Sequence, residues 1–172
     1  CPVIEHNTKI THIILSNCNI GDDGAIRLAN ALFKNINIKE INLDDNHIGE
    51  RGVLQLSEKV FGKISLIKIN LAHNEINSKG AEYIGKSLEE ASNLQSLSLN
   101  SNSIGNEGCE NLSIGLEKND SLIELNLDNN FITDEGVIAL CKVLKFKENL
   151  MTLSLASNSI NQIENEFLEV LD

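Results

Sequence analysis

Residues 94–104 read Leu-Gln-Ser-Leu-Ser-Leu-Asn-Ser-Asn-Ser-Ile, and the same arrangement of apolar and polar residues occurs six times along the chain. Each copy is apolar at positions 1, 4, 6 and 11 and has asparagine at position 9, except that the first copy has Cys18 there. Successive copies lie 28 residues apart without an insertion. They begin at Ile10, Ile38, Leu66, Leu94, Leu122 and Leu150. A fixed period of this length predicts a stack of repeated structural units.

The two halves of each unit have different periodicities. Positions 3–7 alternate, which predicts a short strand with positions 4 and 6 facing inward and positions 3, 5 and 7 facing outward. Positions 16, 19, 20 and 23 are apolar or small, and their spacing of three and four residues predicts one face of a helix. Position 15 is glycine in five copies, at the start of the predicted helix. Each unit is therefore expected to be strand, turn, helix and return.

A single unit of this kind cannot bury its own apolar faces, so the units must stack on one another. Neighbouring strands are about 4.8 Å apart, whereas packed helices need roughly 10 Å. The helical side is wider, and the stack must bend. We therefore predict an α/β solenoid in the form of a horseshoe, with a parallel β-sheet on the concave face and α-helices on the convex face.

The asparagines at position 9 have a predicted structural role. The chain turns away from the strand there, which leaves backbone groups without partners in the sheet. A side-chain amide both donates and accepts, so a column of amides can bridge successive turns. The predicted column is Asn46, Asn74, Asn102, Asn130 and Asn158, with Cys18 at its head.

The chain is expected to form one repeat domain over residues 1–172, with the last repeat incomplete. In that repeat Glu164 replaces the glycine, and Phe167, Val170 and Leu171 are expected to close the end of the core. Because the chain begins with Cys1 and not methionine, we expect it to be a fragment of a longer protein.

Composition excludes several classes of function. The 25 acidic residues outnumber the 14 Lys and Arg, which gives a net charge of −11 and no basic footprint for nucleic acid. Aromatic residues are only 3%, and no apolar run reaches the roughly 18 residues that span a bilayer. We expect a cytoplasmic monomer that binds neither nucleic acid nor membrane. The four cysteines form no C-x-x-C pair and are interpreted as small buried residues, apart from Cys1, which is a candidate for a bridge or an exposed thiol. The 24 asparagines are a further unusual feature.

The repeated phrase, L-x-x-L-x-L-x-x-N-x-I followed by G-A-x-x-L-x-x-x-L, resembles the leucine-rich repeat proteins of the ribonuclease-inhibitor-like class. The resemblance covers residues 10 to about 171, with five full copies and a sixth incomplete one. It implies a horseshoe that binds another protein and leaves the partner unidentified.

The outward strand positions and the adjacent turn give the candidate binding surface, which we call the strand face. It is polar, rich in amides and locally acidic, so the expected partner has a basic surface. The alternative interpretation of each residue is an ordinary solvated sheet face. The candidate residues are Glu40, Asn42, Asp44, Asp45, Lys68, Asn70, His73, Asn100, Glu124, Asn126, Asp128 and Phe131.

Two features of this surface have two interpretations each. Phe131 is an aromatic residue in an otherwise polar column, and it is either an exposed anchor for a partner or folded back onto the neighbouring loop. Asp45 with His73 and His47 with Glu75 occupy equivalent positions in adjacent repeats. They form a two-by-two patch of potential metal ligands, although hydrogen bonds and ion pairs are the favoured interpretation.

The chain contains no phosphate-binding, metalloprotease or nucleophile-elbow motif, and we predict no enzyme activity, no cofactor and no metal. Two alternative functions come from the resemblance. Some ribonuclease-inhibitor-like horseshoes activate a small GTPase through asparagine-rich edges. Others are sensor domains of immune receptors or effectors that bacteria inject into the host cytosol. The excess of lysine over arginine is a weak compositional hint of an AT-rich genome.

Overall fold

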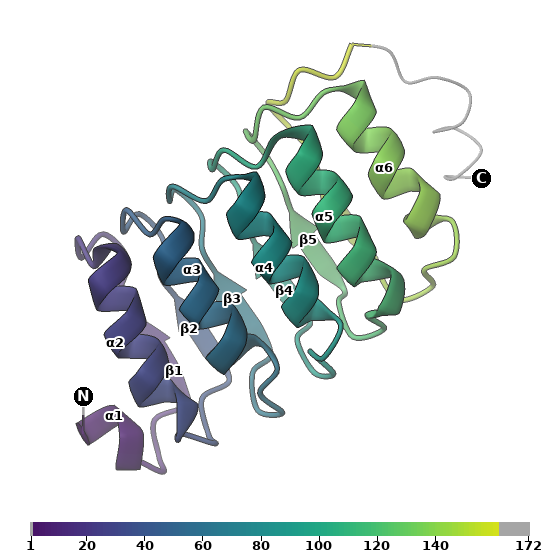
Figure 1. The fold of residues 1–172 in the computed structure, drawn as a ribbon. Helices are drawn as coiled ribbons and strands as arrows, with labels where there is room; N and C mark the ends of the chain where they lie inside the picture. The colour runs from purple at the N-terminus through teal and green to yellow at the C-terminus, as the bar shows by residue number, and fades with distance from the viewer. Residues whose placement is uncertain (1, 162–172) are drawn as a thin grey trace.

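The structure is a computed structural model and describes residues 2–161. Short strands alternate with helices along the chain, in two layers (Figure 1). The strands are β1 (His12–Ile14), β2 (Glu40–Asn42), β3 (Lys68–Asn70), β4 (Ser96–Ser98), β5 (Glu124–Asn126) and β6 (Thr152–Ser154). The helices are α1 (Pro2–His6), α2 (Gly21–Phe33), α3 (Glu50–Leu56), the π-helix η1 (Ser57–Phe61), α4 (Ser78–Leu88), α5 (Gly105–Lys118) and α6 (Asp134–Leu144).

The six strands form one parallel sheet in the order of the sequence, which confirms the predicted solenoid. Each strand pairs with the next so that residues one repeat apart in the sequence lie opposite each other. His12 pairs with Glu40, and Glu40 pairs with Lys68. Equivalent positions of successive repeats are therefore direct neighbours across the sheet. The sixth strand pairs with β5 in the same register.

The strands are shorter than predicted. Each covers positions 3–5 only, although position 6 is buried as expected, for example at Leu43 and Leu71. The reason lies in the backbone, because the residue at position 8 has a positive φ in every repeat and turns the chain out of the sheet. Position 7 is also less exposed than predicted, since Ala72 is buried.

The core lies between the sheet and the helices. The inward strand residues meet the helix residues at positions 16, 19, 20 and 23, and nearly all of them are fully buried in the central repeats. The glycine at position 15 allows a close contact within each repeat. A Cβ at Gly52 would approach Ile48 Cγ2 to 2.8 Å, and one at Gly108 would approach Ile104 Cγ2 to 2.4 Å.

The predicted asparagine column is present, and Asn74 illustrates its bonding. Its Oδ1 accepts from the backbone N–H groups of Asn46 at 3.2 Å and Ile48 at 2.9 Å, both in the preceding repeat. Its Nδ2 donates to the carbonyl oxygens of Leu43 at 3.0 Å and Ala72 at 2.8 Å. The side chain therefore satisfies backbone groups of two repeats at the turn.

Two cysteines confirm the prediction and one corrects it. Cys109 and Cys141 are buried in helix positions, whereas Cys18 is exposed. Cys18 heads the asparagine column, and its backbone N–H donates to Asn46 Oδ1 at 3.0 Å. Cys1, Glu164, Phe167, Val170 and Leu171 lie outside the described residues. No helix within residues 2–161 has the length and apolar character needed to cross a bilayer.

Candidate functional site

Two columns of side chains on the solvent side of the sheet form the central part of the strand face, and the adjacent turns form its rim. The parallel register places Glu40 beside Lys68, and Asn42 beside Asn70. It also places Glu124 beside Ser96, two repeats from Lys68. The acidic residues at the two ends of the strand face are thus separated by Lys68 and by the uncharged strand-face residues of the fourth repeat.

Two of the three acids in the first acidic cluster, which is made of Glu40, Asp44 and Asp45, lie beside histidines. Glu40 Oε1 lies 3.2 Å from His12 Nε2, and Asp44 Oδ1 lies 2.8 Å from His73 Nδ1. Asp45 is exposed; its backbone N–H donates to the Ala72 carbonyl oxygen at 3.0 Å, and its carboxylate has no hydrogen-bond or ion-pair partner among the described residues. Asp45 therefore remains available to a partner, while Asp44 is held by the adjacent repeat.

The second acidic cluster has two members with different environments. Asp128 Oδ1 accepts from Ser154 Oγ at 2.6 Å and from the backbone N–H of Ala156 at 2.7 Å. These bonds tie the fifth repeat to the sixth and give Asp128 a structural role. Glu124 is exposed, and among the described residues its carboxylate accepts a hydrogen bond only from Ser96 Oγ, at 3.1 Å. Glu124 is consequently the more accessible acid of the pair.

Three asparagines of the strand face have a bonding role that the sequence analysis missed. Asn42 Oδ1 accepts from the backbone N–H of Asp44 at 3.0 Å, and the amides of Asn70 and Asn126 accept from the residue two positions on at 2.9 Å. The bond lies within one strand end, and the Asx-turn preference of asparagine is the signal that points to it. Within residues 2–161 the amide nitrogens of these side chains donate no hydrogen bond, so they can contact a partner.

Phe131 is exposed and not folded back. Its side chain is 69% exposed, and its backbone has φ of 58°, in the left-handed region. Asn19 and His47 have the same backbone conformation at the same repeat position. Glu75 and Ser103 do not, and their backbone N–H groups bond to the preceding repeat instead. The rim of the strand face thus displays a large apolar group on a strained turn.

The two-by-two patch forms ion pairs, but not all of the pairs follow the predicted columns. His47 Nδ1 lies 3.1 Å from Glu75 Oε1, as the column predicts. The pairing of His73 with Asp45 is wrong, because His73 reaches Asp44 instead. Asp45 and His73 both occupy position 8 and both have a left-handed backbone, whereas Asp44 lies one residue earlier, at position 7. Within residues 2–161, no group of three or more His, Cys, Asp and Glu side chains converges in a way that could hold a metal ion.

The described residues form five strand–helix units and a sixth strand, with one parallel sheet, exposed outward columns and an asparagine column at the turns. This arrangement defines a repeat solenoid of the α/β type. The Leucine Rich repeat family model matches the chain five times. The matched residues are 6–29, 34–57, 63–85, 90–113 and 118–141. The chain belongs to this family, whose domains generally mediate protein–protein interaction.

Two solved structures are similar to the chain. One is described as leiomodin-1 actin-binding site 2. Its sequence is 19% identical, the match covers 98% of this chain and 80% of the leiomodin-1 chain, and the TM-score is 0.62. A second is the tropomodulin C-terminal domain of Caenorhabditis elegans. Its sequence is 18% identical, the match covers 85% of this chain and 90% of the tropomodulin chain, and the TM-score is 0.72. A search of curated protein sequences finds no match. These findings support the fold, and the ribonuclease-inhibitor-like class stays a prediction.

Proposed function

We propose that this chain is a non-enzymatic module that binds a partner protein through the strand face. The observation that carries the proposal is the exposure of Phe131 on an otherwise polar rim. A bulky residue in the left-handed region costs conformational energy, and an exposed aromatic ring gains nothing from the core to offset that cost. Binding a partner would supply the missing gain, because aromatic side chains are common anchors of interfaces.

The accessible acids indicate the kind of partner. Glu124, in the same repeat as Phe131, is exposed, and Asp45 and Glu40 lie at the other end of the face. Carboxylates of this kind mainly raise the association rate and the selectivity for a positively charged surface. The proposed partner therefore has an apolar pocket for Phe131 beside a basic area for Glu124.

Affinity purification with the whole chain as bait tests this proposal. The bait variants Phe131→Ala and Glu124→Lys are expected to lose the partner that the wild-type chain retains. Phe146→Ala and Glu117→Lys are matched controls, because Phe146 and Glu117 are exposed but lie outside the strand face. Retention of the partner by both strand-face variants would rule out this face.

Actin is a defined protein to include in the same test, since one of the similar structures is described as an actin-binding site. Co-sedimentation of the chain with filamentous actin, with the same four variants, gives a direct measurement. Binding that Phe131→Ala and Glu124→Lys weaken and the controls leave unchanged would identify actin as a partner. The GTPase-regulator, effector and receptor alternatives stay predictions from the family resemblance.

A further inference from the structure

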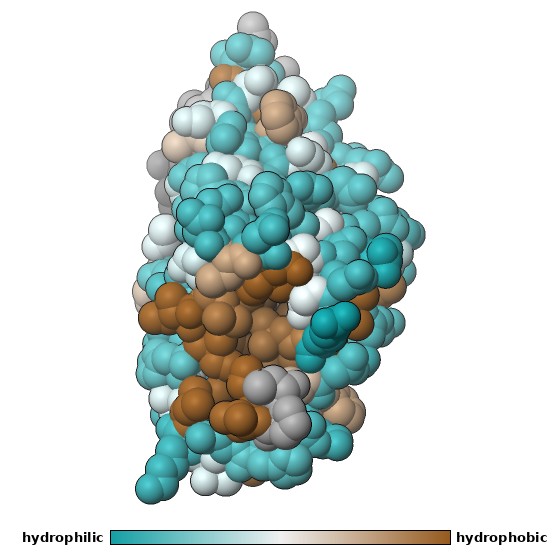
Figure 2. Space-filling model, turned by 90° about the vertical axis from the view of Figure 1, so that its left-hand side faces the viewer, coloured by the Kyte–Doolittle hydropathy of each residue, from teal (hydrophilic) through white to brown (hydrophobic). Residues whose placement is uncertain are grey.

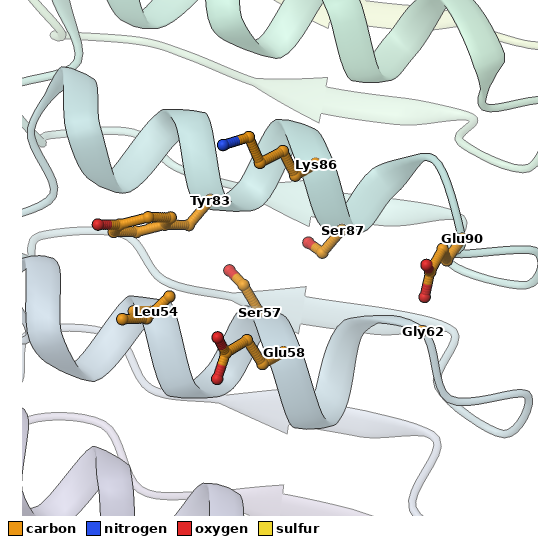
Figure 3. Close-up of a pocket in the computed structure, with 8 residues that line it drawn as sticks. All are labelled: Leu54, Ser57, Glu58, Gly62, Tyr83, Lys86, Ser87 and Glu90. Carbon is orange, nitrogen blue, oxygen red and sulfur yellow. The ribbon is translucent and has the colours of Figure 1, made fainter.

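A groove runs along the convex side of the solenoid, between the helical segment α3–η1 and helix α4 (Figure 3). It has a volume of about 440 Å³, within the range of natural ligand sites. The lining residues are Leu54, Ser57, Glu58, Gly62, Tyr83, Lys86, Ser87 and Glu90. The groove therefore lies on the opposite layer from the strand face and is independent of it.

Close packing of the next two helices accompanies this groove. A Cβ at Gly85 would come within 2.3 Å of the Asn111 carbonyl oxygen, and one at Gly115 within 2.0 Å of the Gly85 carbonyl oxygen. The backbones of α4 and α5 are thus in direct contact, which is possible only because both residues are glycine. The neighbour of α4 on its other side has Ser57 at the position of Gly85 and changes there from an α-helix to a π-helix. Turns of π-helix are rare in proteins, and those that occur often lie at functional sites.

Ser57 is a buried polar group without a partner. Its side chain is 4% exposed, and its Oγ makes no hydrogen bond within the described part of the chain. Figure 3 shows this hydroxyl directed from η1 toward α4. Ser113 provides an internal comparison, because it occupies the same repeat position in a regular α-helix and its Oγ donates to the Cys109 carbonyl oxygen at 2.7 Å. The hydroxyl of Ser57 therefore has an unused capacity to bond a ligand.

On the η1 side of the groove, the lysines bond to residues of α2, whereas a glutamate lines the groove. The lysines of the η1 segment bind toward α2, since Lys59 Nζ donates to Asn30 Oδ1 at 2.6 Å and Lys63 Nζ to the Phe33 carbonyl oxygen at 2.7 Å. Glu58 lines the groove and accepts from the neutral amide of Gln55 at 2.9 Å.

The α4 side of the groove adds a second uncompensated acid. Glu90 lines it without a side-chain partner among the described residues. The single cation in the lining, Lys86, is already paired with Glu82 at 2.6 Å. The groove consequently has two carboxylates without a cationic partner, and its field favours a cationic ligand.

We propose that this groove binds a short extended segment of a partner protein that carries a lysine or arginine. The cationic group lies between Glu58 and Glu90, and its aliphatic stem packs toward Tyr83 and Leu54. The segment's backbone supplies the hydrogen-bond partner of Ser57. A polypeptide fits better than a compact small molecule, because residues 54–62 span roughly 12 Å of helix, the length of three to four extended residues.

Amide chemical shifts of the ¹⁵N-labelled whole chain test this site. The probe is a blocked Ala-Ala-Lys-Ala-Ala peptide, and the expected result is a set of shift changes confined to residues 54–62 and 83–90. The double variant Glu58→Gln with Glu90→Gln is expected to weaken binding roughly fivefold, since two exposed ion pairs are lost. Its matched control is Glu110→Gln with Glu117→Gln, which removes the same charge from exposed positions of α5 and leaves binding unchanged.

Ser57→Ala separates a ligand site from a structural defect. Alanine occupies the same repeat position at Ala29, so the variant is expected to fold with a raised melting temperature and to bind the lysine peptide more weakly. The proposal is overturned if the peptide shifts no amides in the groove, if a glutamate peptide shifts them equally, or if the control pair loses binding as well. If butylamine at the same concentration shifts these amides equally, the groove binds a small amine and the proposed polypeptide segment is wrong.

Discussion

Phe131 combines a strained backbone with an exposed ring, two properties that are separately uncommon for an aromatic residue. The left-handed conformation follows from the turn, because Asn19 and His47 adopt it at equivalent positions. Asparagine tolerates this region well, since its short side chain can bond locally. The choice of phenylalanine therefore costs stability in the isolated chain.

This residue gives the first prediction. Phe131→Asn is expected to stabilise the chain by about 0.5–1 kcal/mol, because the backbone strain is relieved and no buried contact is lost. Urea denaturation measures the change. Ser103→Asn is the matched control, because Ser103 has the same repeat position without a positive φ, and no gain is expected there. A loss of stability in Phe131→Asn would show that the ring packs more than its exposure indicates.

Cys109 gives a pH-dependent prediction. Burial raises the pKa of the Cys109 thiol from 9.0 to about 12. Below about pH 9 the thiol is neutral in both states and has no effect; above it the unfolded state ionises and the folded state does not, so stability falls as the pH rises toward 12. Cys109→Ala should lose less stability than the wild-type chain between about pH 8 and pH 10 in urea denaturation. An equal loss of stability in the two chains over this range would contradict the raised pKa of Cys109.

At the scale of the element, each turn between strand and helix is held by one buried side chain. The position 9 asparagines accept from the preceding repeat and donate to two repeats, so a single amide replaces the sheet bonds that end at the turn. The turn could not be buried otherwise, because unpaired backbone groups carry a large desolvation cost.

Removal of this side chain is the third prediction. Asn74→Ala is expected to destabilise the chain by about 2–4 kcal/mol, because it leaves the buried backbone N–H groups of Asn46 and Ile48 without their acceptor. Thermal or urea denaturation measures the loss. Asn42→Ala removes one half-buried bond and should cost less than about 1.5 kcal/mol. Equal stabilities of the two variants would contradict the ladder.

At the scale of the whole molecule, the repeats differ in how many neighbours cover them. Figure 2 shows an apolar area at the end of the stack that carries α1 and α2. Ile14 and Phe33 of the first repeat are 73% and 60% exposed. The equivalent strand core residue is fully buried at Ile69 but 7% exposed at Ile13. An end repeat has one stabilising interface where an inner repeat has two.

Hydrogen exchange tests this difference. The amides of β1 and α2 are expected to exchange faster than those of β3, β4 and α4, because the first repeat opens without disrupting a second interface. Mass spectrometry of the exchanged chain, resolved to these segments, measures the order in which they exchange. Equal protection of β1 and β3 would mean that the stack opens only as a whole.

Much of the strand face could be anticipated from the repeat alone, and its chemistry could not. Period and alternation placed Glu40, Lys68 and Glu124 outward, since each depends only on its position in a strand. The bonds of Asp128 to the sixth repeat and of His73 to Asp44 depend on side-chain directions at a left-handed turn, which the sequence pattern does not encode.

The structural asparagines also divide into those that the sequence predicts and those that it does not. The position 9 column was predicted because it recurs every 28 residues. Asn35 and Asn119 were not, although both are buried and bond the return loops; Asn119 Nδ2 donates to the Leu88 and Ala91 carbonyl oxygens at 2.8 Å. Their repeat position holds Lys63 and Ala91 in other copies, so no column marks it.

The sequence by itself determined the solenoid, the parallel register and the inward and outward columns of this chain. These follow from periodicity, which fixes the neighbours of every residue at the same position one repeat away. The tertiary structure alone decided the exposure of Phe131, the unpartnered hydroxyl of Ser57 and the groove between α3–η1 and α4. These depend on departures from the period, a strained turn, a π-helix and a pair of glycines in contact, and each departure acts through the neighbours that only folding brings together.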